Sequence, residues 1–508
     1  MPASTTTTPA RRRPWPVPRH RATALALSAA LVLASMACSG PSGPAPDDAD
    51  GTTTPAVEPT PGPGDTAPPV NPVPLATGMS VAAAASGDVV EAGHGPGFAT
   101  QAVATVDGDG QPVLVWGTYT DATGRASVVQ AARYDPATGS WTKPVELFSG
   151  RVGHDGAGRS IAATTDATTG ALHVVWSHGG DEPGPTRTIS LATSTDGGRT
   201  WTTQRVAEEA GLATPSVAAA DDLVHVTWWS ERDGVVRAVG TPATEPTADR
   251  RWERFVAPVP SGFVPLATAP AVTVDPSGAP VIAYATTTPN GSVGRVLVWR
   301  PDRAATAVPV ADVGQSGPPA LALGMHGDAP VVALTGTDVR TPAATTPTTG
   351  PPGTSVLPAP ASTTTTSTTG DRTERDAASP WAWVVRVGPT GAPTAPVALE
   401  AGSAGRRTDD LPLPPGIGLA VLPDGTAAVA LVPVVASTTC VVARDGPDDQ
   451  PRQHTACSRS ADDQPQVIPS GRAASLVRLA DGRLAVPLGN SEAAPGLPVG
   501  LTLWVGPA

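Results

Sequence analysis

The sequence is poor in several residue types. Its 508 residues include three cysteines, three tyrosines, four phenylalanines and one lysine, Lys143. Pro144 follows that lysine, so no Gly-x-x-x-x-Gly-Lys-[Ser/Thr] phosphate-binding loop is present. The net charge is −12, which argues against nucleic acid as a partner because such binding relies on lysine and arginine to neutralise phosphates.

Motifs for several catalytic chemistries are missing as well. The sequence has no His-Glu-x-x-His, no Gly-x-Ser-x-Gly and no cysteine–histidine cluster with metal-ligand spacing. The stretch Asp107-Gly-Asp109-Gly is too short for an EF-hand loop and is typical of a hairpin turn. The sequence therefore predicts neither a metal site nor a cofactor.

The first 37 residues have the pattern of a signal peptide. Five arginines between positions 11 and 21 precede an apolar run of sixteen residues, Ala22 to Ala37, whereas a bilayer span needs about 20. The segment Ala34-Ser-Met-Ala-Cys38 resembles the lipobox of bacterial lipoproteins, with Ser35 where leucine is usual. The resemblance implies export, acylation of Cys38 and anchoring to the outer face of the cell membrane through this lipid only. The alternative is a plain secretory signal and a secreted protein.

Cysteine usage agrees with the lipoprotein interpretation. If Cys38 is acylated, Cys440 and Cys457 remain, and an exported protein permits them to form a disulfide. They lie 17 positions apart, so closing this loop would stabilise the fold by roughly 3 kcal/mol. The alternative is two buried free thiols.

Residues 38–74 are rich in proline, glycine and threonine and almost free of large apolar side chains. Such a segment buries too little surface to fold, and its prolines favour an extended tether. We expect the folded domain to occupy residues 75–508, with a threonine- and proline-rich insertion at 338–379.

Short apolar runs recur through this domain, each after a turn signal. The runs are Val113–Trp116, His173–Trp176, His225–Trp228, Val281–Tyr284, Val331–Leu334, Ala428–Leu431 and Ala485–Leu488. Their ends lie 60, 52, 56, 50, 97 and 57 positions apart, and the insertion accounts for the one long interval. Because no helical periodicity follows the signal peptide, the pattern predicts an all-β fold, a β-propeller of seven four-stranded blades. Six blades are the alternative. The last repeat is one strand short, and a strand around Ser86 to Ala92 would complete it and close the ring.

One stretch carries a family resemblance. Ser194-Thr-Asp196-Gly-Gly198-Arg-Thr200-Trp201 fits Ser-x-Asp-x-Gly-x-Thr-Trp, the Asp-box (BNR repeat) of sialidase-like β-propellers, and Asp135 to Trp141 is a looser copy. We expect Asp196 to accept hydrogen bonds from backbone N–H groups of the turn and Trp201 to pack beneath it.

The resemblance implies a substrate face built by two sets of loops, those between second and third strands and those between one blade and the next. Candidate catalytic residues there are Tyr119, Asp155, Arg159, Glu231 and Arg232, and candidate binding residues are His154, His178 and Trp229. The alternative for each is a solvated loop residue. Four aromatic residues at one repeated position, Trp116, Trp176, Trp228 and Tyr284, fit blade-to-blade packing better than sugar stacking.

The sialidase mechanism itself finds little support in the residues. The family uses three arginines, a tyrosine–glutamate nucleophile in a late blade and an acidic acid/base residue, and a Phe-Arg-Ile-Pro motif supplies the first arginine. This chain has no such motif and no tyrosine after Tyr284. We therefore expect a monomeric, non-catalytic module that binds a glycan or a cell-envelope protein. A divergent sialidase or other glycoside hydrolase, and a scaffold or assembly factor for an envelope complex, are the alternatives.

Overall fold

The structure is a computed structural model. It describes residues 99–119, 126–151, 161–179, 186–210, 214–242, 252–314, 318–336, 338–342, 382–388, 391–399, 416–432, 441–445, 451–455, 475–489 and 501–506. The chain divides into two compact units, Met1–Ala67 and Pro68–Ala508, and every described residue belongs to the second. The described part contains no helix, and correspondingly no helical segment with the length and hydropathy of a membrane span. The expected all-β class is confirmed there.

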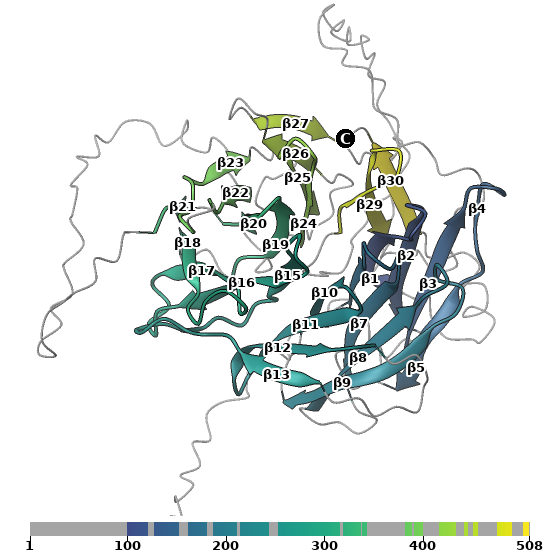
Figure 1. Cartoon of the computed structure of the whole chain (residues 1–508), viewed down its shortest axis with the longest axis horizontal. Helices are drawn as coiled ribbons and strands as arrows, with labels where there is room; N and C mark the ends of the chain where they lie inside the picture. Colours follow the sequence, from purple (N-terminus) through teal and green to yellow (C-terminus); the bar gives the residue numbers. More distant parts are fainter. Residues whose placement is uncertain are drawn as a thin grey trace, which may run out of the picture. The chain divides into compact units, whose positions relative to one another are not determined.

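The described strands form seven antiparallel sheets, and each sheet takes its strands from one continuous part of the chain, with a single exception (Figure 1). The first sheet contains β1 (Ala99–Val106), β2 (Pro112–Tyr119), β3 (Ala126–Asp135), β4 (Ser140–Trp141) and β5 (Val145–Arg151). The second contains β6 (Ile161–Thr165), β7 (Leu172–Gly179), β8 (Thr186–Ser194) and β9 (Thr202–Ala210). The third contains β10 (Ser216–Ala220), β11 (Leu223–Ser230), β12 (Gly234–Gly240) and β13 (Glu253–Val256).

The later sheets vary more. The fourth contains β14 (Val264–Pro265), β15 (Ala271–Val274), β16 (Pro280–Thr287), β17 (Gly294–Trp299), β18 (Val308–Val313) and β21 (Val339–Arg340). The fifth contains β19 (Leu321–His326), β20 (Ala329–Thr335), β22 (Ala382–Arg386) and β23 (Val397–Leu399). The sixth contains β24 (Gly416–Val421), β25 (Ala427–Val432), β26 (Val441–Asp445) and β27 (Pro451–Thr455). The seventh contains β28 (Val477–Arg478), β29 (Leu484–Gly489) and β30 (Leu501–Gly506).

The exception is β21, at the start of the expected insertion. It follows β20 of the fifth sheet in the chain, yet it pairs with β18, the outer strand of the fourth. Val339 is 6% exposed, and the Gly314 N–H donates to the Asp338 carbonyl at 2.8 Å. The first residues of the threonine-rich tract are therefore packed on a neighbouring sheet. The rest of the insertion, the strand expected around Ser86 to Ala92, and the boundaries at 37/38 and 74/75 lie outside the described residues.

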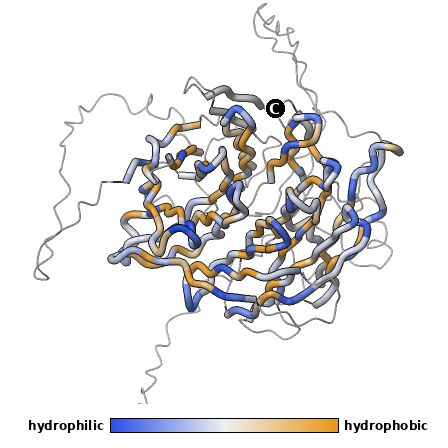
Figure 2. Tube along the Cα trace, in the orientation of Figure 1, coloured by the Kyte–Doolittle hydropathy of each residue, from blue (hydrophilic) through white to orange (hydrophobic). Residues whose placement is uncertain are grey.

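Each of the seven repeated apolar runs lies in a central strand of a different sheet. These strands are β2, β7, β11, β16, β20, β25 and β29. In Figure 2 the strands are mostly hydrophobic and the connecting turns mostly hydrophilic. Each sheet packs against two others. Its central strand is therefore buried on both faces, and for this reason the runs are apolar at successive positions.

The repeated aromatic residues fill the spaces between sheets. Trp116, Trp176, Trp228 and Tyr284 are at most 1% exposed. Trp176 packs with residues of the first sheet, Trp228 with the second and Tyr284 with the third. The expected packing role is confirmed, because none of the four offers a ring face to solvent.

The first and last sheets also contact each other. Trp116 packs in one cluster with Leu479, Ala485 and Leu503 of the seventh sheet. The Ser475 hydroxyl accepts from the Ala104 N–H at 3.0 Å and donates to the Ala104 carbonyl at 2.7 Å. The two ends of the described chain thus share a core and a pair of hydrogen bonds.

A buried histidine makes stability sensitive to acid. His173 of β7 is 1% exposed, and its Nδ1 lies 3.1 Å from the Thr193 hydroxyl. Burial lowers the pKa of His173 to about 4, although the charge of Asp166 acts in the opposite direction. Below pH 6.5 the unfolded chain binds a proton that the folded protein does not, so stability falls as the pH drops from 6.5 toward 4.

We predict that His173→Gln flattens this dependence. Between pH 6.5 and 5 the wild-type free energy of unfolding should fall by about 1.5 kcal/mol more than that of the variant, because the slope rises from half of its full value of about 1.36 kcal/mol per pH unit at pH 6.5. Urea titrations at several pH values measure the difference, and His326→Gln, at an exposed position, is the control. Equal slopes for wild type and His173→Gln would contradict the prediction.

Candidate functional site

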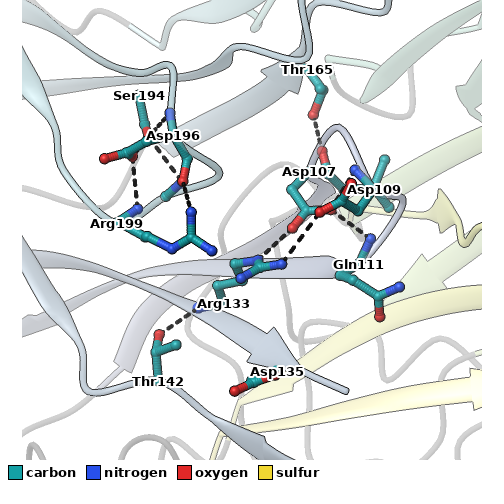
Figure 3. Close-up of polar contacts among 12 residues, drawn as sticks. Asp107, Asp109, Gln111, Arg133, Asp135, Thr142, Thr165, Ser194, Asp196 and Arg199 are labelled. Atoms are coloured by element: carbon teal, nitrogen blue, oxygen red, sulfur yellow. Dashed lines mark hydrogen bonds and ion pairs between the residues drawn. The ribbon is translucent and has the colours of Figure 1, made fainter. Parts of the chain in front are cut away.

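The Asp-box forms the turn between β8 and β9, and its hydrogen bonds are those expected from the sequence (Figure 3). Asp196 Oδ1 accepts from the N–H groups of Arg199 and Thr200 at 3.0 and 2.9 Å and from the Ser194 hydroxyl at 2.8 Å. Asp196 Oδ2 accepts from the Thr200 hydroxyl at 2.6 Å. Partial burial raises the pKa of Asp196, but these hydrogen bonds outweigh it and lower the pKa to about 2. The carboxylate is thus committed to holding the turn.

Trp201 completes the box. Its indole N–H donates to the Gly198 carbonyl at 3.0 Å, and its ring packs against the core between the first two sheets. Gly197 and Gly198 have φ angles of 70° and 86°, a backbone conformation that glycine adopts without steric cost. The predicted packing of Trp201 beneath the turn is confirmed, and the motif acts as a structural element.

A buried ion pair lies beside the Asp-box (Figure 3). Asp107 in the β1–β2 turn accepts from Arg133 Nε at 2.5 Å and from the Gln111 N–H at 2.8 Å. The side chain of Asp107 is 1% exposed, and Gly197 lies against both members of the pair. The carboxylates of Asp107 and Asp196 are therefore both occupied by structural contacts.

The opposite end of the sheets carries the loops expected to bind a ligand. Because the strands of each sheet are antiparallel, the turn between the second and third strands lies at one end and the turn between the third and fourth strands lies at the other. The Asp-box is a turn of the latter kind, so the expected binding loops lie at the end away from it. The β11–β12 turn and the last residues of β9 meet at this end, between the second and third sheets.

Four polar residues come together there, and we call them the Glu209 cluster: Glu209, Ser230, Asp233 and Arg254. One Arg254 nitrogen, Nη2, lies 2.7 Å from Glu209 Oε1 and 2.7 Å from Asp233 Oδ2. The Ser230 hydroxyl donates to Glu209 Oε2 at 2.9 Å. Glu209 and Ser230 are buried, whereas the side chains of Arg254 and Asp233 are 40% and 27% exposed. Solvent or a ligand can therefore reach the cluster at Arg254 and Asp233 but not at Glu209 and Ser230.

Further groups shape the electrostatics of the cluster. Arg254 lies 5.8 Å from the centre of the Trp228 ring, a cation–π contact. Arg187 stands opposite Glu209 in the β8–β9 pairing, and burial lowers the pKa of Arg187. Arginines on two strands, Arg187 and Arg254, therefore lie close to the Glu209 carboxylate.

The structure places the predicted site residues in different surroundings. Glu231 and Arg232 are exposed in the β11–β12 turn, next to the Glu209 cluster. Trp229 faces the fourth sheet and packs with Tyr284. His178 lies between Ser190 and Phe148, with Nε2 3.1 Å from the Ser190 hydroxyl and the two rings 4.4 Å apart.

Other predicted positions remain predictions. Tyr119 is the last residue of β2, and its side chain is outside the described part. His154, Asp155, Arg159 and the cysteines Cys38, Cys440 and Cys457 also lie outside the described residues. Three or more metal-binding side chains do not gather at any point of the described structure.

Glu209 and Arg254 are not among the site residues predicted from the sequence. Glu209 follows Glu208 near the end of a strand, and Arg254 follows Glu253 in a charged stretch, so both look like solvated positions. No local pattern marked them, because Glu209 falls on the same face of β9 as Val206 only through a shift in the β8–β9 register, where Ile189 pairs with Ala207 and Ser190 with Arg205.

Comparisons with known proteins give fold-level similarities only. No protein-family model and no curated protein matches the chain. Among solved structures, it is similar to an α-L-arabinanase of Penicillium chrysogenum complexed with arabinobiose, at 12% identity and a TM-score of 0.39, covering 81% of this chain and 93% of that one. It is also similar to the SapL1 lectin in complex with α-methyl fucoside, at 12% identity and a TM-score of 0.38, covering 72% and 98%. A Trypanosoma rangeli sialidase in complex with sialic acid matches at 11% identity and a TM-score of 0.39, covering 71% and 55%.

The Asp-box contacts predict a graded effect on stability. Asp196→Ala removes four hydrogen bonds to a carboxylate and should lower the free energy of unfolding by about 2 kcal/mol. Asp135→Ala, in the looser copy, removes one bond, from the Ala137 N–H, and should cost about 0.5 kcal/mol. Urea denaturation measures both values, and an equal loss in the two variants would contradict the assigned role of Asp196.

Proposed function

We propose that residues 75–508 form a seven-bladed, sialidase-like β-propeller that binds a glycan without cleaving it. Support for the ring comes from seven successive sheets and from the contact between the first and the last. Support for binding comes from one observation, the Glu209 cluster at the end of the sheets away from the Asp-box.

The chemistry of the cluster suits sugar hydroxyl groups. Arg254 has further N–H donors beyond the nitrogen that it shares between two carboxylates, and the Asp233 carboxylate has lone pairs to accept hydrogen bonds. A donor and an acceptor side by side match two neighbouring hydroxyl groups of a sugar ring. Because Glu209 and Ser230 hold Arg254 in place from beneath, little side-chain freedom is lost on binding.

Hydrolysis is the second candidate, and one distance favours it. Glu209 and Asp233 contact the same nitrogen, so their nearest oxygens are at most about 5.4 Å apart, a limit that is compatible with the separation of roughly 5–5.5 Å between the two carboxyl groups of retaining glycosidases. However, such enzymes need one carboxyl group in its protonated form. Both carboxylates here contact the same Arg254 nitrogen, which leaves neither free to act as that acid, so we place binding before catalysis.

We predict that Arg254→Ala weakens glycan binding at least about tenfold, since it removes charge-assisted hydrogen bonds. The purified domain is screened on a glycan array, and the Kd of a retained glycan is then measured for each variant. Arg483→Ala is a matched control, because Arg483 is 49% exposed and pairs with Asp481 in the β28–β29 turn. Capture of an envelope protein with no glycan retained would favour the scaffold alternative. Turnover of an aryl glycoside that Glu209→Gln abolishes would replace binding by hydrolysis.

We also propose that acylated Cys38 anchors the protein to the outer face of the membrane through the tether at 38–74. The basic and apolar segments before Cys38 and the composition of the tether support this proposal. In a bacterial host, Cys38→Ala should abolish incorporation of a clickable fatty acid and release the protein into the medium. Cys440→Ala should leave both readouts unchanged, and acylation of Cys38→Ala would refute the anchor.

A further inference from the structure

Arg237 of β12 is a buried arginine with a poor carboxylate partner. Its side chain is 6% exposed, and the nearest carboxylate, that of the half-exposed Asp302, lies 3.9 Å away. Two other largely buried arginines have close partners: Arg133 lies 2.5 Å from Asp107, and Arg295 lies 2.6 Å from Asp312. Buried charges are normally paired. Arg237 therefore stands out as a buried cation that lacks a close counter-charge.

The hydrogen bonds around Arg237 determine which neighbouring groups can donate. Arg237 Nη2 lies 3.2 Å from His225 Nδ1, and because a guanidinium only donates, Nδ1 accepts. Burial and the charge of Arg237 lower the pKa of His225 to about 4, so the ring is neutral at pH 7. The proton of the neutral ring is then on Nε2, which makes Nε2–H a donor.

Three polar atoms in this place have no hydrogen-bond partner. They are His225 Nε2, Thr227 Oγ1 and Arg237 Nε, all inaccessible to solvent. Thr227 and Arg237 are direct partners in the β11–β12 pairing, and His225 lies two residues from Thr227, so it points to the same face of the sheet. Two of the three groups can only donate a hydrogen bond, and the hydroxyl group can do so as well.

The surroundings enclose these donors between two sheets. Arg237 stacks on Phe255 at 5.2 Å, and Phe255 packs in the cluster that joins the third and fourth sheets. Asp302, in the β17–β18 turn of the fourth sheet, approaches from the other side. Burial lowers the pKa of Arg237, although the charges of Asp302 and Glu253 act in the opposite direction. A water molecule could accept two hydrogen bonds here, but it would bring no charge to compensate the guanidinium.

We propose that Arg237 and Thr227 form a buried binding site for a small monovalent inorganic anion, of which chloride is the type, and that His225 positions the guanidinium through its Nδ1. Such an anion accepts from Arg237 Nε and the Thr227 hydroxyl, which lie opposite each other in the β11–β12 pairing, and neutralises the guanidinium. It thereby joins the third sheet to the fourth, in the interior and apart from the Glu209 cluster.

Thermal unfolding tests the site. Sodium chloride or bromide, compared with sodium gluconate at equal ionic strength, should raise the Tm of the wild-type protein by about 3 °C, since an anion that binds only the folded state stabilises it. Thr227→Val keeps the charge but removes one donor and should lose most of this difference. Arg237→Met should lose all of it. Arg205→Met, at a side chain that is 63% exposed, should retain it.

Crystals grown in bromide give a second test that does not depend on whether a variant folds. An anomalous peak within hydrogen-bond distance of Arg237 Nε and Thr227 Oγ1 is the expected result. A peak-free map with a water molecule in that position, or the same Tm in halide and gluconate, would overturn the proposal.

Discussion

The packing of one sheet on the next is the constraint on which this structure depends. A four-stranded sheet of this size has two apolar faces and cannot bury either alone. In four sheets a large ring at the same repeated position fills this space: Trp176, Trp228 and Tyr284 pack against the preceding sheet, and Trp116 packs against the seventh. In the other three sheets a leucine stands at that position: Leu334, Leu431 and Leu488.

Polar groups between sheets then divide into two kinds. Near the Asp-box, the carboxylates of Asp107 and Asp196 each accept several short hydrogen bonds from neighbouring groups, so these carboxylates hold the turns in place. Around Glu209 and Arg237 the charged side chains are less fully paired with opposite charges. Arg254 is shared by two carboxylates and is partly exposed, whereas Arg237 is enclosed without a close carboxylate. Where a fold retains charge that it does not fully compensate, a ligand can supply the compensation.

The features that follow from local pattern could be predicted from the sequence. The repeated apolar runs identified a central strand in every sheet, and the hydrogen bonds of Asp196 followed from the motif, since every partner lies within four residues. The Glu209 cluster could not be predicted. Glu209 and Arg254 are 45 positions apart on outer strands of different sheets, and their meeting depends on a bulge in β8–β9 and on the angle between sheets. A single sequence encodes neither in a short pattern.

The contact between Ser475 and Ala104 spans 371 positions. Until the last strands are made, the apolar face formed by Leu114 and Trp116 has no partner, and closing so long a loop is slow. Because a chain is synthesised from its N-terminus, the first sheet waits for residues 475–506 before its core is complete. During that delay the exposed face is a site for aggregation or for a chaperone, and a truncation of the C-terminal strands would damage the opposite end of the chain first.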